Sequence, residues 1–88
     1  MIYYMYLLRC SDNSLYCGQT TDIERRVKEH NEGGKKSAKY TRGRLPVELV
    51  YCEKYETVSG VLKREIEVKK LSKNKKEKLI LNQSVTKT

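Results

Sequence analysis

The sequence predicts an α+β domain in which a small sheet is flanked by helices, in the order β-β-α-β-α-α. Three observations lead to this prediction. An almost wholly apolar or aromatic run at residues 2–10 precedes a Ser-Asp-Asn turn and a second short strand pattern. Two later segments space their aliphatic residues as helices do. A third strand pattern lies between those two helices.

The first strand, residues 2–10, is apolar enough to be buried on both faces of a sheet, and residues 15–19 form its returning partner. The length of the connecting turn decides where Tyr6 and Tyr16 point. A three-residue loop makes the two tyrosines diagonal neighbours on one face, whereas a two-residue loop places them on opposite faces. Asn13, which would end the longer loop, tolerates the left-handed conformation. The length of this turn therefore determines whether the two hydroxyls share a site.

Turn and capping residues delimit the remaining elements. Asp22 and the two threonines before it can cap the first helix, and a Gly-Gly pair stops it. Thr57 or Ser59 can cap the second helix, and Ser72 the third. In order, these elements are a helix over residues 23–32, a basic loop over 35–44, a third strand over 47–53, and helices over 58–71 and 73–81. They make one domain over residues 1–82, with residues 83–88 as a frayed tail.

The chain of 88 residues carries a net charge of +8. This excess suggests a polyanionic partner, with nucleic acid ahead of anionic lipid, although a lysine-rich surface also serves solubility alone. No apolar run approaches the ~18 residues that cross a bilayer. The first strand begins at once, which leaves no room for a signal peptide. We therefore expect a cytoplasmic protein without membrane association, and no feature indicates a protein partner or a homodimer.

Cysteine and histidine usage excludes several kinds of site. Cys10, Cys17 and Cys52 are odd in number and widely spaced. In a cytoplasmic chain this pattern predicts small buried apolar residues rather than metal ligands or a disulfide. His30 is the only histidine, which argues against a structural zinc site and excludes a mechanism that needs two histidines.

The first helix places two polar residues toward the sheet. At ~100° per residue, Ile23 and Val27 define its buried stripe, His30 falls within ~20° of Ile23, and Arg26 flanks it at ~60°. The neighbouring Arg25 points the opposite way. Arg26 either packs its stem while its charged head reaches water, or it serves a site on the sheet.

The second helix carries a carboxylate among its aliphatic residues, because Glu65 lies within ~20° of the centre of the apolar face. The residues that mark this face are Val58, Val61, Leu62, Ile66 and Val68. A buried carboxylate is costly unless it is paired or binds a cation. Two explanations stay open, namely an ion pair with Arg26 or Lys69, or a cation site.

Two phenols, a guanidinium, an imidazole and one carboxylate therefore face inward beneath a basic surface. This set suits phosphodiester chemistry. It lacks the paired carboxylates of a glycosidase or of a typical two-metal nuclease. The sequence also has no Walker A pattern and no Gly-x-Ser-x-Gly elbow.

Several segments form an ordered series along the chain. The series begins with YMY (residues 4–6) and YCG (residues 16–18), and the blocks GQTTDIERRVKEHN, AKYTRGRLPVELVY and LKREIEVKKLS follow. It resembles the GIY-YIG nuclease domain over residues 2–81, and specifically the small stand-alone bacterial members of the UPF0213 type. YMY stands where that family has Gly-Ile-Tyr, and YCG where it has Tyr-Ile-Gly. The resemblance implies a three-stranded antiparallel sheet with flanking helices, which agrees with the elements above.

The resemblance also implies a role for each inward-facing residue. Tyr6 would be the general base or would position the attacking water, Tyr16 would bind the water or the scissile phosphate, and Arg26 would stabilise negative charge. His30 would be an auxiliary polar group. Glu65 would be the sole protein ligand of one Mg²⁺ or Mn²⁺ ion, bound together with substrate. Because a phenol with a pKa of ~10 is a poor base at pH 7, Arg26 and the metal would have to lower the pKa of Tyr6.

Two positions depart from the family pattern. Tyr4 and Met5 replace the first two residues of the first motif and leave Tyr6 in place. Gln19 stands where several family nucleases carry a lysine, which removes one positive charge beside the phosphate. Asn82 is a candidate for the asparagine that family members often carry late in the domain.

Three functions are compatible with the sequence. The first is a metal-dependent endonuclease that cleaves nucleic acid, DNA ahead of RNA, in repair or recombination. The second is a basic nucleic-acid-binding module with a weak or inactive site, and the third is a structural subunit that binds a partner through an exposed apolar surface. Basic side chains would bind phosphates with release of counterions, and an aromatic one would stack on a base. These residues are Lys35, Lys36, Lys39, Arg42 and Arg44 for phosphate, and Tyr40 for the base.

Overall fold

In the computed structural model, which describes residues 1–86 and the side chains of residues 1–82, three strands form one antiparallel sheet. The strands are β1 (Tyr3–Arg9), β2 (Leu15–Thr20) and β3 (Glu48–Tyr55), arranged in the order β2-β1-β3. β1 is therefore the central strand. Its residues 5–8 are buried, as the apolar run predicts. The predicted α+β class with a three-stranded antiparallel sheet is confirmed.

The hairpin that joins β1 to β2 has the three-residue turn. The Cys10 N–H donates to the Ser14 carbonyl at 2.9 Å, and the Asn13 N–H donates to the Cys10 carbonyl at 2.9 Å. Asn13 has a φ of 69°, the left-handed conformation that an asparagine tolerates. Leu8 pairs with Tyr16, so Tyr6 and Tyr16 lie on one face of the sheet.

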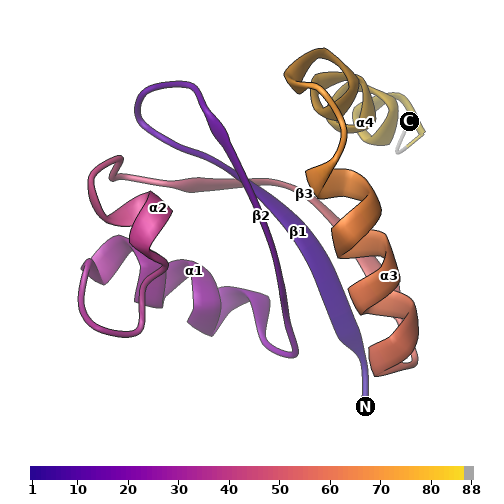
Figure 1. Cartoon of the computed structure of the whole chain (residues 1–88), viewed down its shortest axis with the longest axis horizontal. Helices are drawn as coiled ribbons and strands as arrows, with labels where there is room; N and C mark the ends of the chain where they lie inside the picture. Colours follow the sequence, from indigo (N-terminus) through magenta and orange to yellow (C-terminus); the bar gives the residue numbers. More distant parts are fainter. Residues whose placement is uncertain (87–88) are drawn as a thin grey trace.

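Helices cover both faces of the sheet (Figure 1). α1 (Ile23–Glu32) and α2 (Lys39–Arg42) lie on one side, and α3 (Val58–Lys69) and α4 (Lys73–Thr86) lie on the other (Figure 1). α1 begins where the Asp22 side chain accepts the Arg25 N–H, and it ends at Gly33, whose φ is 71°. Within residues 1–86, no helix combines the length and the apolar character that a membrane span requires.

The alternation of side chains along β1 divides the core into two clusters. On the α3 side, the buried residues are Met5, Leu7, Cys17, Val61 and Val68. On the α1 side, they are Tyr6, Leu8, Cys10 and Val47, with Tyr16, Ile23 and Val27 packed against them. The thiols of Cys10 and Cys17 are thus buried among apolar residues, as predicted, whereas Cys52 is half-buried at the margin of the second cluster.

One short helix was missed, and several predicted element boundaries differ from the structure. The basic loop over 35–44 contains the short helix α2, β3 extends to Tyr55, α3 ends at Lys69, and α4 extends to Thr86. α2 is missed because it has one turn and no capping side chain, so its sequence shows no helical period. Residues 87–88 lie outside the described residues, and the frayed tail stays a prediction.

The predicted apolar face of α3 was partly wrong. Val58, Leu62 and Ile66 are 48%, 39% and 56% exposed, whereas Val61 and Val68 are fully buried. The helix therefore packs its 61-65-68 row on the sheet, and the neighbouring 58-62-66 row faces solvent. Because 65 belongs to the packed row, the predicted inward placement of Glu65 holds, with its side chain 16% exposed.

Candidate active site

The hydroxyl of Tyr6 lies at the centre of a buried polar cluster on the α1 side of the sheet. Tyr6 is 1% exposed, and its Oη lies 3.1 Å from Nε2 of His30, which is fully buried. The ring of Tyr16 lies 6.5 Å from the ring of Tyr6 and 5.4 Å from the imidazole, measured between centroids. Strand parity and helix periodicity thus bring together three of the residues that the sequence selected.

Gly18 makes room for the Tyr6 hydroxyl. A Cβ at position 18 would lie 2.5 Å from the Tyr6 Oη and 3.2 Å from the ring of Tyr16. Gly18 pairs with Tyr6 across the sheet, so the phenol ring lies over its backbone. The glycine is needed at this position because of this close approach.

His30 is held from its other side by the segment that leads into α2. Its Nδ1 lies 3.0 Å from Oγ1 of Thr41 and accepts the backbone N–H of Ala38 at 3.4 Å. A backbone amide can only donate, so Nδ1 must carry a lone pair, and the proton of the neutral imidazole is on Nε2. The Nε2–H therefore donates to the Tyr6 Oη. The Tyr6 proton is left to donate to another group.

Thr41 is a site residue that sequence reasoning missed. It is fully buried, and the single proton of its hydroxyl is shared between two acceptors at 3.0 Å, Nδ1 of His30 and the Ala38 carbonyl. The sequence places Thr41 in a basic stretch without apolar periodicity, so no pattern marks it as buried. One signal was available, because a β-branched residue without charge stands between Tyr40 and Arg42 in an otherwise polar loop.

Arg26 brings positive charge to the same cluster. Its Nη1 donates to Oε1 of Glu29 at 3.1 Å and to the Lys36 carbonyl, and its side chain is 26% exposed. This agrees with the first interpretation of Arg26, a packed stem with a partly accessible head, and its role at a site on the sheet stays a prediction. Glu29, which sequence reasoning also missed, is 17% exposed and orients the guanidinium.

Burial governs the ionisation of the two central groups. Burial raises the pKa of Tyr6 to about 12, and a hydrogen bond and the charge of Arg26 only partly oppose this. Burial, and next the charge of Arg26, lower the pKa of His30 to about 4. Arg26 alone therefore does not lower the pKa of Tyr6 below its usual value, and lowering by Arg26 together with a metal stays a prediction. At neutral pH the cluster contains a neutral phenol, a neutral imidazole and one guanidinium.

Glu65 lies on the opposite side of the sheet from this cluster. It projects from α3 beside Cys17, and its Oε2 lies 3.4 Å from Nζ of Lys69. Within the described residues no hydrogen bond or ion pair joins Glu65 to Tyr6 or Arg26. Of the two partners that the sequence left open, the structure selects Lys69, whose side chain is 53% exposed. β2 is an edge strand, so the two sides meet around its outer edge.

The donors near Glu65 fit a single hard cation but no all-protein metal cage. Among the described residues, no three His, Cys, Asp or Glu side chains gather closely enough to hold a metal ion. A lone carboxylate that is partly accessible suits Mg²⁺, which keeps its waters and takes further ligands from phosphate.

The predicted nucleic-acid-binding residues divide into two groups. Lys35, Lys36 and Lys39 are exposed, and in the described part of the chain they form no ion pair. The others already have intramolecular contacts. The Arg42 guanidinium donates to the carbonyls of Lys35 and Ser37. Arg44 pairs with Asp12 at 3.1 Å and lies 4.0 Å from the centre of the Tyr40 ring.

Tyr40 also lies against Tyr16, with ring centroids 6.0 Å apart and planes at 25°. A base that stacks on Tyr40 would therefore compete with Arg44 or Tyr16. The contact between these two rings also links α2 to the edge strand that carries Tyr16.

The chain is similar to proteins of known family. The model of the GIY-YIG catalytic domain matches residues 2–78. A UPF0213 protein of Natronomonas pharaonis is 50% identical over 82 residues, which cover 93% of this chain and 94% of the relative. The solution NMR structure of the UPF0213 protein BH0048 from Bacillus halodurans is 48% identical and has a TM-score of 0.58, covering 91% of this chain and 83% of that one.

A second solution NMR structure, of the protein EF2693 from E. faecalis, is 40% identical with a TM-score of 0.65. It covers 97% of this chain and 88% of the other. The family match spans both tyrosine motifs, Arg26, His30 and Glu65. With the three-residue turn and the buried tyrosine–histidine contact, these matches show that the chain belongs to the GIY-YIG catalytic-domain family.

Proposed function

We propose that the protein is a nuclease that hydrolyses phosphodiester bonds of nucleic acid, DNA ahead of RNA, with one divalent cation. The observation that carries the proposal is the buried contact between Tyr6 and His30, with Arg26 beside it. Burying the Tyr6 hydroxyl and the His30 imidazole in a small core, with a guanidinium beside them, is costly for folding. These groups lie next to an edge strand, in a chain whose net charge is +8. Such an arrangement is suited to bind and polarise a phosphate.

On the α1 side, the groups would act through hydrogen bonds and charge. Tyr6 is a neutral phenol at pH 7, so of its two expected roles we choose the positioning of water or phosphate over that of a general base. Tyr16 would bind the same water or phosphate from β2. Arg26 would stabilise the negative charge that develops in the transition state.

On the α3 side, Glu65 would hold the divalent cation. The cation, Mg²⁺ or Mn²⁺, supplies Lewis-acid stabilisation of the phosphoryl oxygens when it is bound. Lys69 now neutralises Glu65, and it would be released toward phosphate when a cation takes its place. The exposed lysines Lys35 and Lys36 of the loop and Lys39 at the start of α2 would hold the backbone of the nucleic acid near the site.

The experiment is a cleavage assay with single-stranded, duplex, branched and RNA substrates, in Mg²⁺, in Mn²⁺ and in EDTA. We expect metal-dependent cleavage of at least one substrate. Tyr6→Phe and Arg26→Ala should each lower the rate by ~100-fold or more, because each removes a group aimed at the reacting phosphate. Thermal unfolding of each variant separates lost chemistry from lost fold. Absence of cleavage on every substrate would contradict the proposal.

A second function is favoured by two observations. Gln19 removes a positive charge near the site, and the exposed loop lysines suffice for binding without chemistry. Under this alternative, the protein is a nucleic-acid-binding module whose affinity falls steeply with salt. Salt-dependent binding without cleavage on any substrate would select it. Protein association without nucleic-acid affinity would instead select the structural subunit, for which the exposed 58-62-66 row of α3 is the only support.

A further inference from the structure

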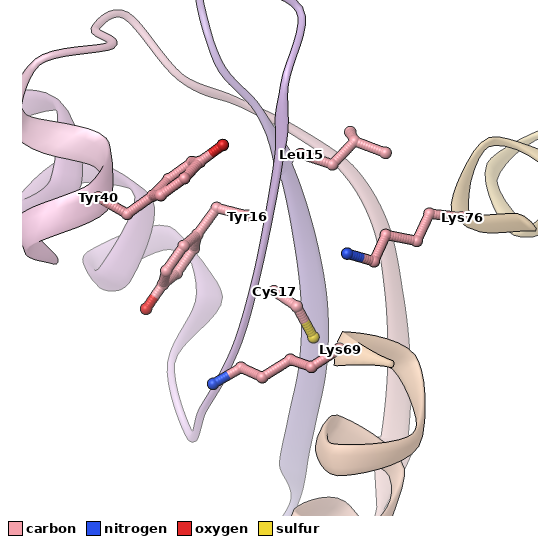
Figure 2. Close-up of a pocket in the computed structure, with 6 residues that line it drawn as sticks. All are labelled: Leu15, Tyr16, Cys17, Tyr40, Lys69 and Lys76. Carbon is pink, nitrogen blue, oxygen red and sulfur yellow. The ribbon is translucent and has the colours of Figure 1, made fainter. Parts of the chain in front are cut away.

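A pocket of about 310 Å³ lies along the outer side of β2 and combines Tyr16 and Tyr40 with two lysines to which the sequence assigned no binding role. Its lining comes from both sides of the sheet (Figure 2). The residues are Leu15, Tyr16, Cys17, Tyr40, Lys69 and Lys76. Figure 2 shows the two lysines reaching toward β2 from α3 and α4, while the two tyrosine rings lie on the other side of the strand.

Lys76 is held at this pocket without an anionic partner. It is half-buried, and among residues 1–82 its side-chain ammonium forms no ion pair or hydrogen bond. Its position is fixed by its neighbour Glu77, which accepts two hydrogen bonds from the Arg9 guanidinium, at 2.7 and 2.8 Å. This bidentate pair ties α4 to the end of β1. An ammonium group that is partly withdrawn from water and unpaired favours an anion at this point.

Lys69 supplies a second ammonium whose partner is exchangeable. Its only ion pair in the described structure is with Glu65, at 3.4 Å across one turn of α3. Such a pair on a half-exposed lysine contributes little to stability. Lys69 can therefore turn to an incoming anion while Glu65 takes a cation.

We propose that this pocket binds a phosphodiester group of a nucleic-acid strand, next to the phosphate held at Tyr16 and Arg26. The strand would cross the outer edge of β2, with one phosphate on the α1 side and a neighbouring one between Lys69 and Lys76. This placement explains how one substrate reaches both Tyr6 and Glu65, which lie on opposite sides of the sheet. The inference rests on the proposed function, since it extends the same substrate across the strand.

The test compares two double variants of equal charge. Lys69→Gln with Lys76→Gln removes the pocket ammonium groups, whereas Lys63→Gln with Lys78→Gln removes two exposed lysines from the same two helices. Binding of a fluorescent oligonucleotide is measured by anisotropy over a range of salt concentrations. Inorganic phosphate and a mononucleotide serve as competitors, which distinguishes a strand from a small phosphate ligand.

We expect the pocket variant to reduce the slope of log affinity against log salt by about 2, roughly one for each phosphate contact. Its affinity at low salt should fall at least tenfold, while the control keeps most of the wild-type slope. Lys69→Arg with Lys76→Arg, which retains the charge, should restore binding. If the wild type binds and the pocket and control variants have equal slopes, the pocket inference is overturned while the proposed function stands. A wild-type protein that binds no oligonucleotide would overturn the proposed function as well.

Amide shifts in NMR spectra give an independent readout. Oligonucleotide should shift the amides of Leu15, Cys17 and Lys76 together with that of Tyr16. Shifts confined to the α1 side would contradict a strand that crosses β2. If inorganic phosphate alone moved the same amides and displaced no oligonucleotide, the pocket would be a small-anion site, and the proposed strand path would be wrong.

Discussion

The two sides of the sheet hold their polar residues in different ways. On the α1 side, Tyr6, His30 and Thr41 are 1%, 0% and 0% exposed and are joined by hydrogen bonds of 3.0–3.1 Å. On the α3 side, Glu65 and Lys69 have side chains that are 16% and 53% exposed and meet in one ion pair. The first set is closed and fixed before any substrate arrives. The second is partly solvated and can exchange partners.

This difference indicates a division of labour. A buried hydrogen-bonded chain keeps its geometry because each group would be costly to leave unpaired. A solvated ion pair contributes little and breaks readily when another ion is offered. Under the proposed function, positioning of the reacting atoms would belong to the α1 side, and binding of the cation and of a neighbouring phosphate to the α3 side. The predictions below test this contrast, from the largest expected effect to the smallest.

Acid should weaken the α1 side first, through His30. Its pKa is lowered to about 4, so the unfolded chain binds a proton at higher pH than the folded one. The contribution of the neutral imidazole to the unfolding free energy is fully present above pH ~6.5. It falls by about 3 kcal/mol as the pH decreases toward 4. Because His30 is the only histidine, an NMR titration follows its ring directly. We expect a midpoint near 4, and a midpoint near 6.5 would show that the ring is solvated.

Gly18→Ala should disrupt the α1 side by overpacking. The added Cβ would lie 2.5 Å from the hydroxyl of Tyr6, a residue that is 1% exposed. We expect a loss of about 1–3 kcal/mol in unfolding free energy, measured by chemical denaturation. Gly34→Ala is the matched control, since a Cβ there meets no atom within 4 Å. Equal stability of the two variants would contradict the close approach of Tyr6 to β2.

Thr41→Val should loosen the imidazole without changing the volume of the core. The valine removes the hydroxyl at 3.0 Å from Nδ1 of His30, and we expect a loss of about 1–3 kcal/mol in unfolding free energy. The nitrogen shifts of the imidazole report its tautomer. The wild type should carry its proton on Nε2, and Thr41→Ser should behave as the wild type. A proton on Nδ1 in the wild type would contradict the assigned direction of the bond to Tyr6.

Lys69→Gln should have the smallest effect on stability. The lysine is half-exposed and pairs only with Glu65, so the unfolding free energy should change by less than about 1 kcal/mol. Thermal unfolding checks this directly. A larger loss would mean that the ion pair is a structural element, and that the α3 side is as fixed as the α1 side.

Local rules predicted the fold and the α1 side well. The sequence left the turn at two or three residues, and the structure has the longer turn with Asn13 in the left-handed conformation, so that strand parity places Tyr6 beside Tyr16. Helix periodicity at ~100° per residue placed His30 and Arg26 toward the sheet. Each of these deductions needs only one element and its neighbour, which is the range over which sequence patterns are informative.

The sequence was less informative where placement depends on tertiary packing. The burial of Thr41 follows from how the basic loop folds onto α1, and no period in residues 35–44 announces it. The sequence also predicted that the 58-62-66 row of α3 is buried, although it faces solvent. Aliphatic residues lie on adjacent rows of this helix, and periodicity alone does not show which row packs on the sheet. The separation of Glu65 from Tyr6 by the sheet likewise depends on which face α3 covers.

The central claim is that groups on both sides of the sheet act on one phosphodiester. Glu65→Gln and Glu67→Gln test it most directly, because they remove one charge each from the same helix, one beside the sheet and one with a side chain 67% exposed. The measurement is the rate of Mg²⁺-dependent cleavage of the preferred oligonucleotide. We predict that Glu67→Gln keeps the wild-type rate and that Glu65→Gln loses at least ~100-fold. Undiminished cleavage by Glu65→Gln would contradict the claim.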